Sequence, residues 1–295
     1  MSDNDLLHRF IIDNTRVRGE MVHLHASWQA VLERYDYPPN VRRILGEAFA
    51  ACALLSATIK YDGSLILQIR GDGPLHLLVI QSTSDGTLRG LARWTGDVPE
   101  EDLPSIFGNG QMAITIEPKK GEPYQGIIAL QGNHIKHAIE NYFIQSEQLN
   151  TRLWLASDEE NCVGFLIQEL PDMEKKSNLE TNHNDWEHAE QLANTLTDEE
   201  LLSLKTEEIL HRLFHEDDVR LFEPSPLSFR CGCSTERIAQ MIVTLGIDEA
   251  RSIIDEQGKI QVDCEFCNAE YIYDSVDVEN LFSAVVQTDP PSTHH

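Results

Sequence analysis

Four of the six cysteines form two close pairs near the C-terminus. Cys231 and Cys233 make a CxC motif, and Cys264 and Cys267 make a CxxC motif thirty residues further on. Four thiolates at about 2.3 Å complete the tetrahedral shell of Zn²⁺ and leave no open position. On spacing alone we favour a closed site that binds one Zn²⁺ per chain and folds a small domain. The same spacing also places each sulfur beside an oxidation partner, so a thiol switch is the alternative.

The other residues with reactive side chains fit structural roles better. Cys52 and Cys162 lie in apolar stretches, where we expect buried and inert thiols. His211 and His215 are four residues apart, a spacing that can bind metal, but the four cysteines already fill a zinc shell. No GxSxG, HExxH or strand–GxGxxG–helix motif occurs, and the Gly-rich stretches lack the Lys-Ser/Thr of a Walker loop. The residues give no support to an enzymatic site.

Composition limits the partners. The 295 residues suffice for one sizeable core and a smaller appendage. The 49 acidic residues against 23 basic ones give a formal net charge of −26, which opposes binding to the phosphates of nucleic acids. The N-terminus shows no basic and apolar segments of a signal peptide, and no apolar run is long enough to span a membrane. We expect a cytoplasmic protein, whose thiols are reduced.

The elements that must position the cysteines begin with an α+β domain over residues 1–176. Residues 39–59 read as a long helix that is apolar on nearly every face in its second half, so we expect antiparallel sheets around this buried helix. Two further helices are predicted, at 27–35 and 133–148. Strands are predicted as a pair within 8–25, then at 64–70, 75–80, 87–94, 111–117, 124–130, 151–156 and 162–169.

Residues 177–228 differ in character and are predicted to be a metastable helical linker. Between positions 183 and 218 the chain carries eleven acidic and two basic residues, yet leucines recur at helical spacing. Thr197 with Glu200 forms a capping box, and Thr206 is a second candidate N-cap. Two or three short amphipathic helices with strong like-charge repulsion need tertiary packing to persist. An ordinary solvated linker is the simpler interpretation.

Residues 229–288 are predicted to be a small zinc-binding α+β domain. Helices are expected at 234–245 and 248–255, and short strands at 259–262 and 270–274 bracket the CxxC motif. The last residues, 289–295, read as a mobile polar tail.

Taken together, these patterns resemble the redox-regulated thirty-three-kilodalton heat-shock chaperonin family of bacteria. The resemblance is carried by the two cysteine pairs behind an acidic helical linker and by short motifs in the first domain. These motifs are QIRGDGPL at 68–75, GNG at 108–110 before AITI at 113–116, YQG at 124–126, and YF at 142–143 before SEQL at 146–149.

The resemblance covers essentially the whole chain, and it implies a function. It implies a holdase, not an enzyme, that binds unfolding client proteins without ATP. Such a protein is inactive when reduced and zinc-bound, is activated by oxidants, and is a homodimer when active. It also implies that Cys231, Cys233, Cys264 and Cys267 are both zinc ligands and redox sensors, with disulfides Cys231–Cys233 and Cys264–Cys267 in the oxidised state.

Two other classes of protein remain open at this point. A zinc-ribbon interaction module would keep its metal through oxidation and would not bind clients. A thiol oxidoreductase would need its CxxC motif at a helix N-terminus in a βαβ setting, which the sequence does not predict.

Overall fold

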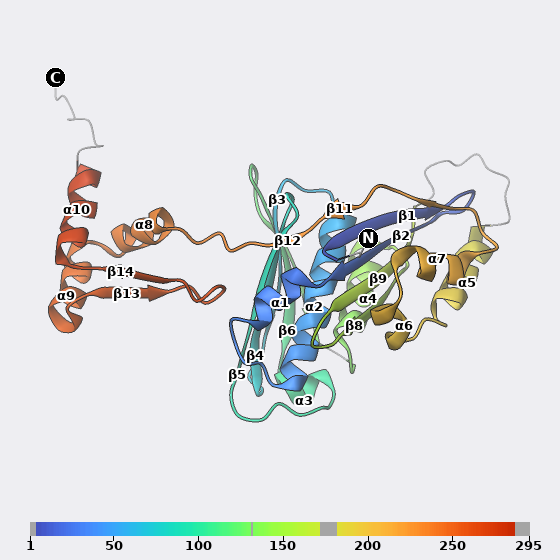
Figure 1. Cartoon of the computed structure of the whole chain (residues 1–295), viewed down its shortest axis with the longest axis horizontal. Coiled ribbons are helices and arrows are strands. Elements are labelled where there is room, and N and C mark those ends of the chain that lie inside the picture. The colour runs from blue at the N-terminus through green and yellow to red at the C-terminus, as the bar shows by residue number, and fades with distance from the viewer. Residues whose placement is uncertain (1–3, 131, 172–181, 287–295) are drawn as a thin grey trace, which may run out of the picture. The chain divides into compact units, whose positions relative to one another are not determined.

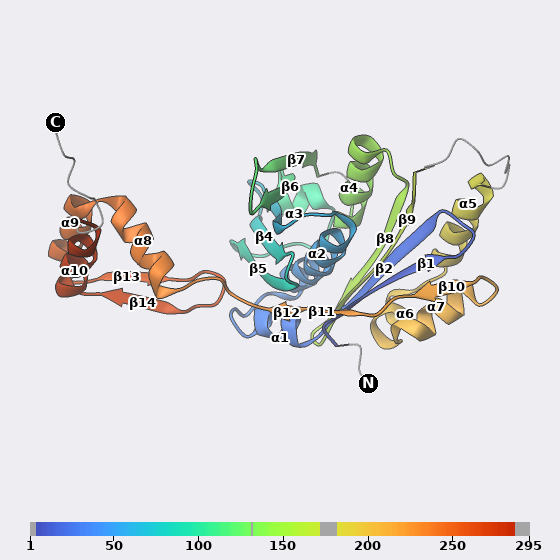
Figure 2. The ribbon, with the colours of Figure 1, turned by 90° about the horizontal axis from the view of Figure 1, so that it is seen from above.

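The larger part of the chain is built on two sheets with a helix between them. A computed structural model describes residues 4–130, 132–171 and 182–286. It divides into two compact units, Met1–Arg230 and Cys231–His295. In the larger unit, helix α2 (Pro39–Thr58) lies between two six-stranded sheets (Figures 1 and 2). This confirms the predicted α+β class with antiparallel sheets around a buried helix.

The first sheet has the strand order β10-β1-β2-β9-β8, and β11 also pairs with β1. Its strands are antiparallel neighbours. Their bounds are β1 Leu6–Ile12, β2 Val17–Leu24, β8 Thr151–Ser157, β9 Cys162–Glu169, β10 Val219–Leu221 and β11 Ser225–Pro226.

The second sheet has the order β12-β5-β4-β3-β6-β7 and is antiparallel except for the parallel β12–β5 pair. Its strands are β3 Gly63–Arg70, β4 Leu75–Thr83, β5 Thr87–Trp94, β6 Gln111–Pro118, β7 Tyr124–Ala129 and β12 Ser228–Phe229. Helices α1 (Ala26–Leu32), α3 (Leu103–Phe107) and α4 (Ile135–Tyr142), with a π-helical turn at Phe143–Glu147, complete this part of the unit.

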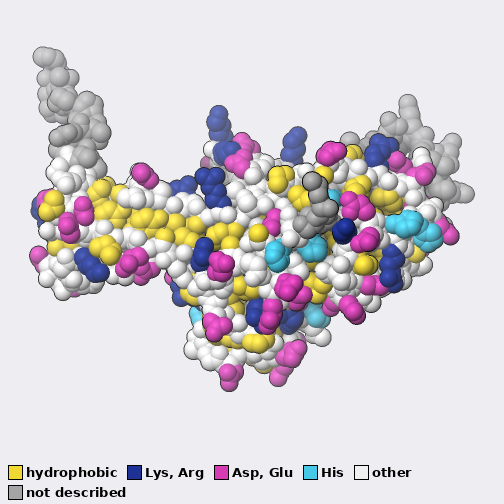
Figure 3. Space-filling model, in the orientation of Figure 1, with side chains coloured by type: hydrophobic (Ala, Val, Ile, Leu, Met, Phe, Trp, Pro, Cys, Tyr) yellow, Lys and Arg dark blue, Asp and Glu magenta, His cyan; other side chains and the backbone are white. Residues whose placement is uncertain are grey.

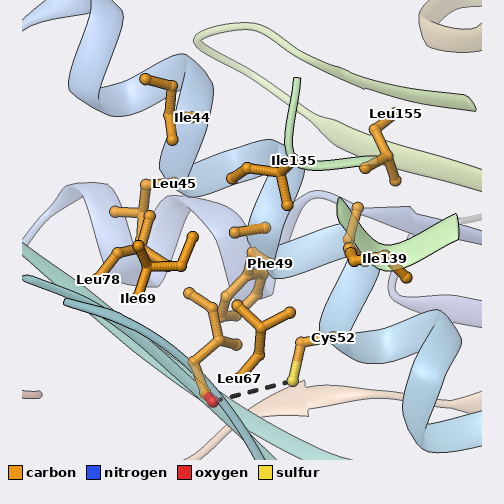
Figure 4. Packing of buried hydrophobic residues seen from close by; sticks show 14 of the residues in the cluster. Ile44, Leu45, Phe49, Cys52, Leu67, Ile69, Leu78, Ile135, Ile139 and Leu155 are labelled. Carbon is orange, nitrogen blue, oxygen red and sulfur yellow. Dashed lines mark hydrogen bonds between the residues drawn. The ribbon is translucent and has the colours of Figure 1, made fainter. Parts of the chain in front are cut away.

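Helix α2 can be surrounded on all sides because its second half is small and apolar. Val41 and all residues from 44 to 55 are buried, whereas Arg42 and Arg43 are partly exposed. Phe49 and Leu45 fill the space toward the second sheet, whereas Ile139 of α4 packs beside them (Figure 4). Gly164 of β9 lets the first sheet approach closely, since a Cβ atom there would lie 2.7 Å from Leu54 Cδ1.

Three linker helices form a second core on the other face of the first sheet. They are α5 (Asn182–Ala193), α6 (Asp198–Ser203) and α7 (Thr206–Phe214). Their buried side chains include Trp186, Leu201 and Phe214, which pack with Phe10 and Phe165 of the sheet. The amphipathic helices expected within residues 177–228 are therefore present, and their apolar stripes face the first sheet.

The helix caps and ends differ in detail from the sequence prediction. Thr197 forms the expected capping box with Glu200. Thr206 is not an N-cap, because it is already helical and fully buried; the cap is Lys205, whose N–H donates to Glu208 at 3.0 Å. The predicted helix over 133–148 is shorter, since the π-helical turn replaces its last part.

Several elements were not predicted. Strands β10, β11 and β12 are only two or three residues long, and they exist because sheet edges supply their hydrogen-bonding partners. They extend the linker past its helices and along both sheets. The proposed boundaries at 176 and 228 stay a prediction, and the tail at 289–295 lies outside the described residues.

The smaller unit has its own core. It contains α8 (Thr235–Leu245), α9 (Ile247–Gln257), the hairpin β13 (Ile260–Asp263) with β14 (Glu270–Tyr273), and α10 (Ser275–Val286). Its core is Ile242, Ala250, Ile260, Tyr273 and Val278. Among the residues of this unit whose burial the structure describes, these five form the buried core; such a small core supplies little stability, and small domains of this kind usually depend on metals or disulfides.

Candidate metal centre

The two cysteine motifs are positioned by different elements of the smaller unit. The CxC motif directly precedes α8, whose N-cap Ser234 accepts a hydrogen bond from the Arg237 N–H at 3.3 Å. The CxxC motif forms the turn between β13 and β14. There the backbone N–H of Cys264 donates to Ala269 O at 2.9 Å, and that of Asn268 donates to Cys264 O at 2.7 Å. The hairpin ladder thus fixes one pair of cysteines, and a helix start fixes the other.

The fold brings all four predicted ligands together. Cys231 Sγ lies 3.5 Å from Cys264 Sγ, and Cys233 Sγ lies 3.3 Å from Cys267 Sγ. All four sulfurs lie within 4.8 Å of one another. Four sulfurs bound to one ion at about 2.3 Å would be separated by about 3.8 Å, so the observed spacing fits a tetrahedral thiolate site. The short sulfur contacts join one motif to the other across the thirty-residue segment.

The surroundings shift the pKa values of three of these thiols in different directions. Burial raises the pKa of Cys231, but hydrogen bonds from the backbone and the thiol of Cys233 outweigh it and lower that pKa to about 7. Burial raises the pKa of Cys264, and it raises that of Cys267 to about 12. The first thiolate is stabilised by the remaining thiols, whereas each further thiolate meets a negative charge. A bound cation removes this conflict, because metal ligation requires every thiol to lose its proton.

Two residues around the sulfurs support the CxC loop. Arg237 donates from Nη1 to the carbonyl oxygen of Gly232 at 2.7 Å, which places a guanidinium beside the loop. Gly232 leaves room for it, since a Cβ atom there would lie 2.9 Å from the same nitrogen. A hydrogen bond to Cys233 raises the pKa of Tyr271, so this hydroxyl also contacts the cluster. Nothing in the cysteine spacing pointed to either residue.

The other two cysteines, Cys52 and Cys162, are buried in the apolar core of the larger unit. Cys52 is fully buried on α2 and donates to Ile80 O at 3.9 Å (Figure 4). Burial raises the pKa of Cys52 to about 12 and that of Cys162 well above its usual value. Both are free thiols, as expected of core residues.

His211 lies on the surface of α7, and His215 is the C-cap of that helix. The rings of His211 and His215 are exposed, and their centroids lie 6.2 Å apart. Histidines gather at the end of the larger unit that carries α5 and α7 (Figure 3). Within the described part of the chain, however, the four cysteines are the only group of three or more potential ligands close enough for one ion.

Comparison with known proteins identifies the family. The profile of the family described as Hsp33 protein matches residues 5–274. The chain belongs to the Hsp33 family. It is 52% identical to the 33 kDa chaperonin of Nitrosococcus oceani over the full length of both chains. It is 44% identical to the 33 kDa chaperonin of Pseudomonas savastanoi, covering 100% of this chain and 99% of that one.

A solved structure shows the same fold in the Hsp33 family. The crystal structure of the 33 kDa chaperonin from Thermotoga maritima matches with a TM-score of 0.81 at 22% identity. The match covers 96% of this chain and 99% of that chain. Separately, none of the helices in the described ranges is both long and apolar enough to cross a membrane.

Proposed function

We propose that this Hsp33 family member is a redox-regulated, ATP-independent chaperone of the cytoplasm. In the reduced state one Zn²⁺ would be held by Cys231, Cys233, Cys264 and Cys267, and the protein would be inactive. Under oxidative stress it would lose the metal, unfold its linker and hold unfolding proteins, as a homodimer. The observation that carries the proposal is the set of sulfur contacts that joins the CxC motif to the CxxC motif.

A metal ion bound by all four cysteines would link the CxC motif to the CxxC motif and stabilise the folded unit. Structural Zn²⁺ contributes about 10–16 kcal/mol of apparent binding free energy, much of which is folding free energy. The small core of the unit depends on such a contribution, because it has few fully buried side chains. The four thiolates hold the metal, and Arg237 offsets part of their excess negative charge.

Oxidation would replace this crosslink with two local ones. Two thiolates lose two electrons to form each disulfide, and one hydrogen peroxide takes up these two electrons and two protons from the solvent and is reduced to two waters. We assign the disulfides to Cys231–Cys233 and Cys264–Cys267. Extrapolation of the chain-entropy relation to such short loops gives only about 2 kcal/mol for each. Neither disulfide connects the first motif to the second, so the halves of the unit would separate.

The linker helices supply an element that can be released. They are held to the first sheet by the apolar contacts of Leu201, Leu213 and Phe214, while eleven carboxylates crowd residues 183–218. Helices of six to twelve residues do not persist without packing. Their release would expose both their own leucines and the sheet beneath, which are apolar surfaces suited to unfolded clients.

Zinc content and suppression of client aggregation, each measured before and after peroxide treatment, test the proposal. We expect one zinc per reduced chain, loss of zinc on oxidation, and suppression only afterwards. Serine at Cys233 and Cys267 should abolish zinc binding. Amide hydrogen exchange should show that residues 187–222 lose protection in the oxidised protein. Retention of zinc with no client binding would instead identify a zinc-ribbon interaction module.

A further inference from the structure

The segment that follows the linker helices covers one edge of each sheet in the larger unit. Strands β10 and β11 pair with β1 of the first sheet, and β12 pairs with β5 of the second. Strand β1 has β2 on its other side, so the short linker strands occupy its remaining edge. An uncovered edge offers unpaired N–H and C=O groups that readily pair with another chain. The linker therefore shields a surface that is suited to strand pairing.

Alternate residues of β1 direct their backbone groups toward the linker. The N–H of Phe222 donates to Arg9 O at 2.9 Å. The N–H of Asp13 donates to Asp218 O at 2.8 Å. Because hydrogen-bonded and non-hydrogen-bonded pairs alternate in an antiparallel ladder, Ile11 also directs its N–H and C=O toward β10. Removal of β10 would leave the backbone groups of three alternate residues without their present partners.

Strand β10 shows which side chains fit at this edge. Val219 and Leu221 lie opposite Ile12 and Phe10 in the register, and they pack against the core beneath the linker helices. Arg220 between them is exposed. The native occupant is thus an extended segment with aliphatic residues at alternate positions on the core side. Its backbone supplies the hydrogen bonds, and its aliphatic side chains cover the neighbouring apolar residues.

Release of the linker would uncover this edge and leave β1 in place. The stretch 187–222, which is expected to lose protection on oxidation, includes β10. Strand β1 would stay in the sheet through its ladder with β2 and through Leu7, which belongs to the core around α2. We propose that in the oxidised protein an extended client segment pairs antiparallel with β1 in the place of β10. The inference rests on the proposed chaperone function and assigns the way in which clients are held.

A client segment is the occupant that agrees with activation by oxidation. Strand addition uses main-chain groups that every unfolded protein carries, so it suits clients of different sequence. In the reduced protein β10 fills the edge, which agrees with an inactive state. A second copy of the chain could place its own β10 there. That exchange would cover the edge of each chain again, and it would not open a surface to clients.

A fluorescent eight-residue peptide that alternates valine with threonine tests the pairing by fluorescence anisotropy with the oxidised full chain. Two versions carry N-methyl groups, either on every threonine nitrogen or on every valine nitrogen. In the arrangement of β10, the polar residue opposite Ile11 turns its N–H toward β1, whereas the aliphatic residues turn theirs away. We expect threonine methylation to weaken binding about tenfold or more, and valine methylation to weaken it less than about threefold. The side chains of the two peptides are identical, so apolar contact alone would not separate them.

A disulfide lock tests the same edge in the protein. Ile12 and Val219 form a non-hydrogen-bonded pair, in which side chains lie close together. Ile12→Cys with Val219→Cys would hold β10 on β1 and leave residues 182–214 able to unfold. The oxidised, locked chain should bind the unmethylated peptide about tenfold more weakly than the wild type.

Thr115→Cys with Gln125→Cys is the matched control for the lock. It places a disulfide across a non-hydrogen-bonded pair of β6 and β7, away from the linker, and it should bind the peptide like the wild type. Mass spectrometry would confirm each engineered disulfide, and hydrogen exchange would confirm that residues 182–214 lose protection in the locked chain. If the lock also protects those residues, the two methylated peptides decide the question alone.

Equal binding of the two methylated peptides, or wild-type binding by a locked chain whose linker helices unfold, would overturn the inference. A dimer that excludes the peptide, and that the lock converts to a monomer, would overturn it as well and assign the edge to a second copy. The proposed function is judged separately, by zinc release and suppression of aggregation in the oxidised wild type. If suppression occurs and the position of the methyl groups has no effect, only this inference is wrong.

Discussion

Weakening the contact between α7 and the first sheet should activate the protein without an oxidant. Phe214 is 1% exposed, its ring lies 6.2 Å from that of Phe10, and Phe10 in turn stacks on Phe165 at 5.7 Å. Leu213 beside it is also buried. The change Leu213→Ala with Phe214→Ala therefore removes two of the main contacts that hold the linker helices to the sheet.

The expected cost of this double change is large. Buried Phe→Ala changes cost about 3–5 kcal/mol and buried Leu→Ala changes about 2–5 kcal/mol. Adjacent residues do not add fully, so we expect about 5 kcal/mol in total. That is comparable to the whole stability of a marginal domain. Since α7 has nine residues and cannot persist alone, the lost contacts should release the linker locally and leave the α2 core folded.

Hydrogen exchange and aggregation assays on the reduced, zinc-loaded variant check this expectation. Residues 182–214 should lose protection, and the variant should suppress client aggregation before any peroxide is added. Phe222→Ala is the control within the linker, because Phe222 is 43% exposed and its loss should change stability by less than about 0.5 kcal/mol.

A second control separates linker release from general instability. Phe107→Ala removes a fully buried ring from the cluster around α2, at a similar expected cost. It should lower stability without activating the reduced protein. If Phe107→Ala activates equally, general instability is the cause. If the linker variant loses protection but does not hold clients, linker release is not sufficient for activity.

Three further predictions follow from buried or loop-forming groups. Cys52→Ala with Cys162→Ala should cost stability through lost packing but leave the oxidative switch intact; a folded double variant that no longer responds to peroxide would contradict this. Burial raises the pKa of Glu20, so its contribution to stability is present below about pH 4.5 and is lost as pH rises through the higher folded value. Glu20→Gln should therefore unfold at a higher denaturant concentration than the wild type at pH 8 but not at pH 4.5, and an equal difference at both pH values would show that ionisation is not responsible. Arg237→Ala should weaken zinc affinity about tenfold in a chelator competition, because the CxC loop loses its side-chain donor. Arg251→Ala, which breaks an exposed ion pair with Glu279 in the same unit, is the matched control, and equal losses of affinity would point to a general effect.

The sequence by itself identified the candidate ligand set and the main elements. Cysteine spacing is local chemistry, so the CxC and CxxC pairs could be identified before any fold was known, and the structure places their sulfurs within 4.8 Å. The apolar second half of α2 and the alternation of the strands are likewise local patterns, and both predicted the α+β core. The helices of the linker followed from leucine spacing and from the cap at Thr197.

Only the tertiary structure decided which surfaces these elements share. Strands β10 to β12 carry almost no signal of their own, because each is held by hydrogen bonds to a sheet edge that lies far away in the sequence. The position of Arg237 beside Gly232 depends on how α8 leaves the CxC motif. Arg70 of β3 and Arg89 and Arg93 of β5 lie on the same side of the second sheet, and only the strand registers of that sheet align them there. Contacts between distant segments depend on the packing of the whole unit, which a local pattern does not contain.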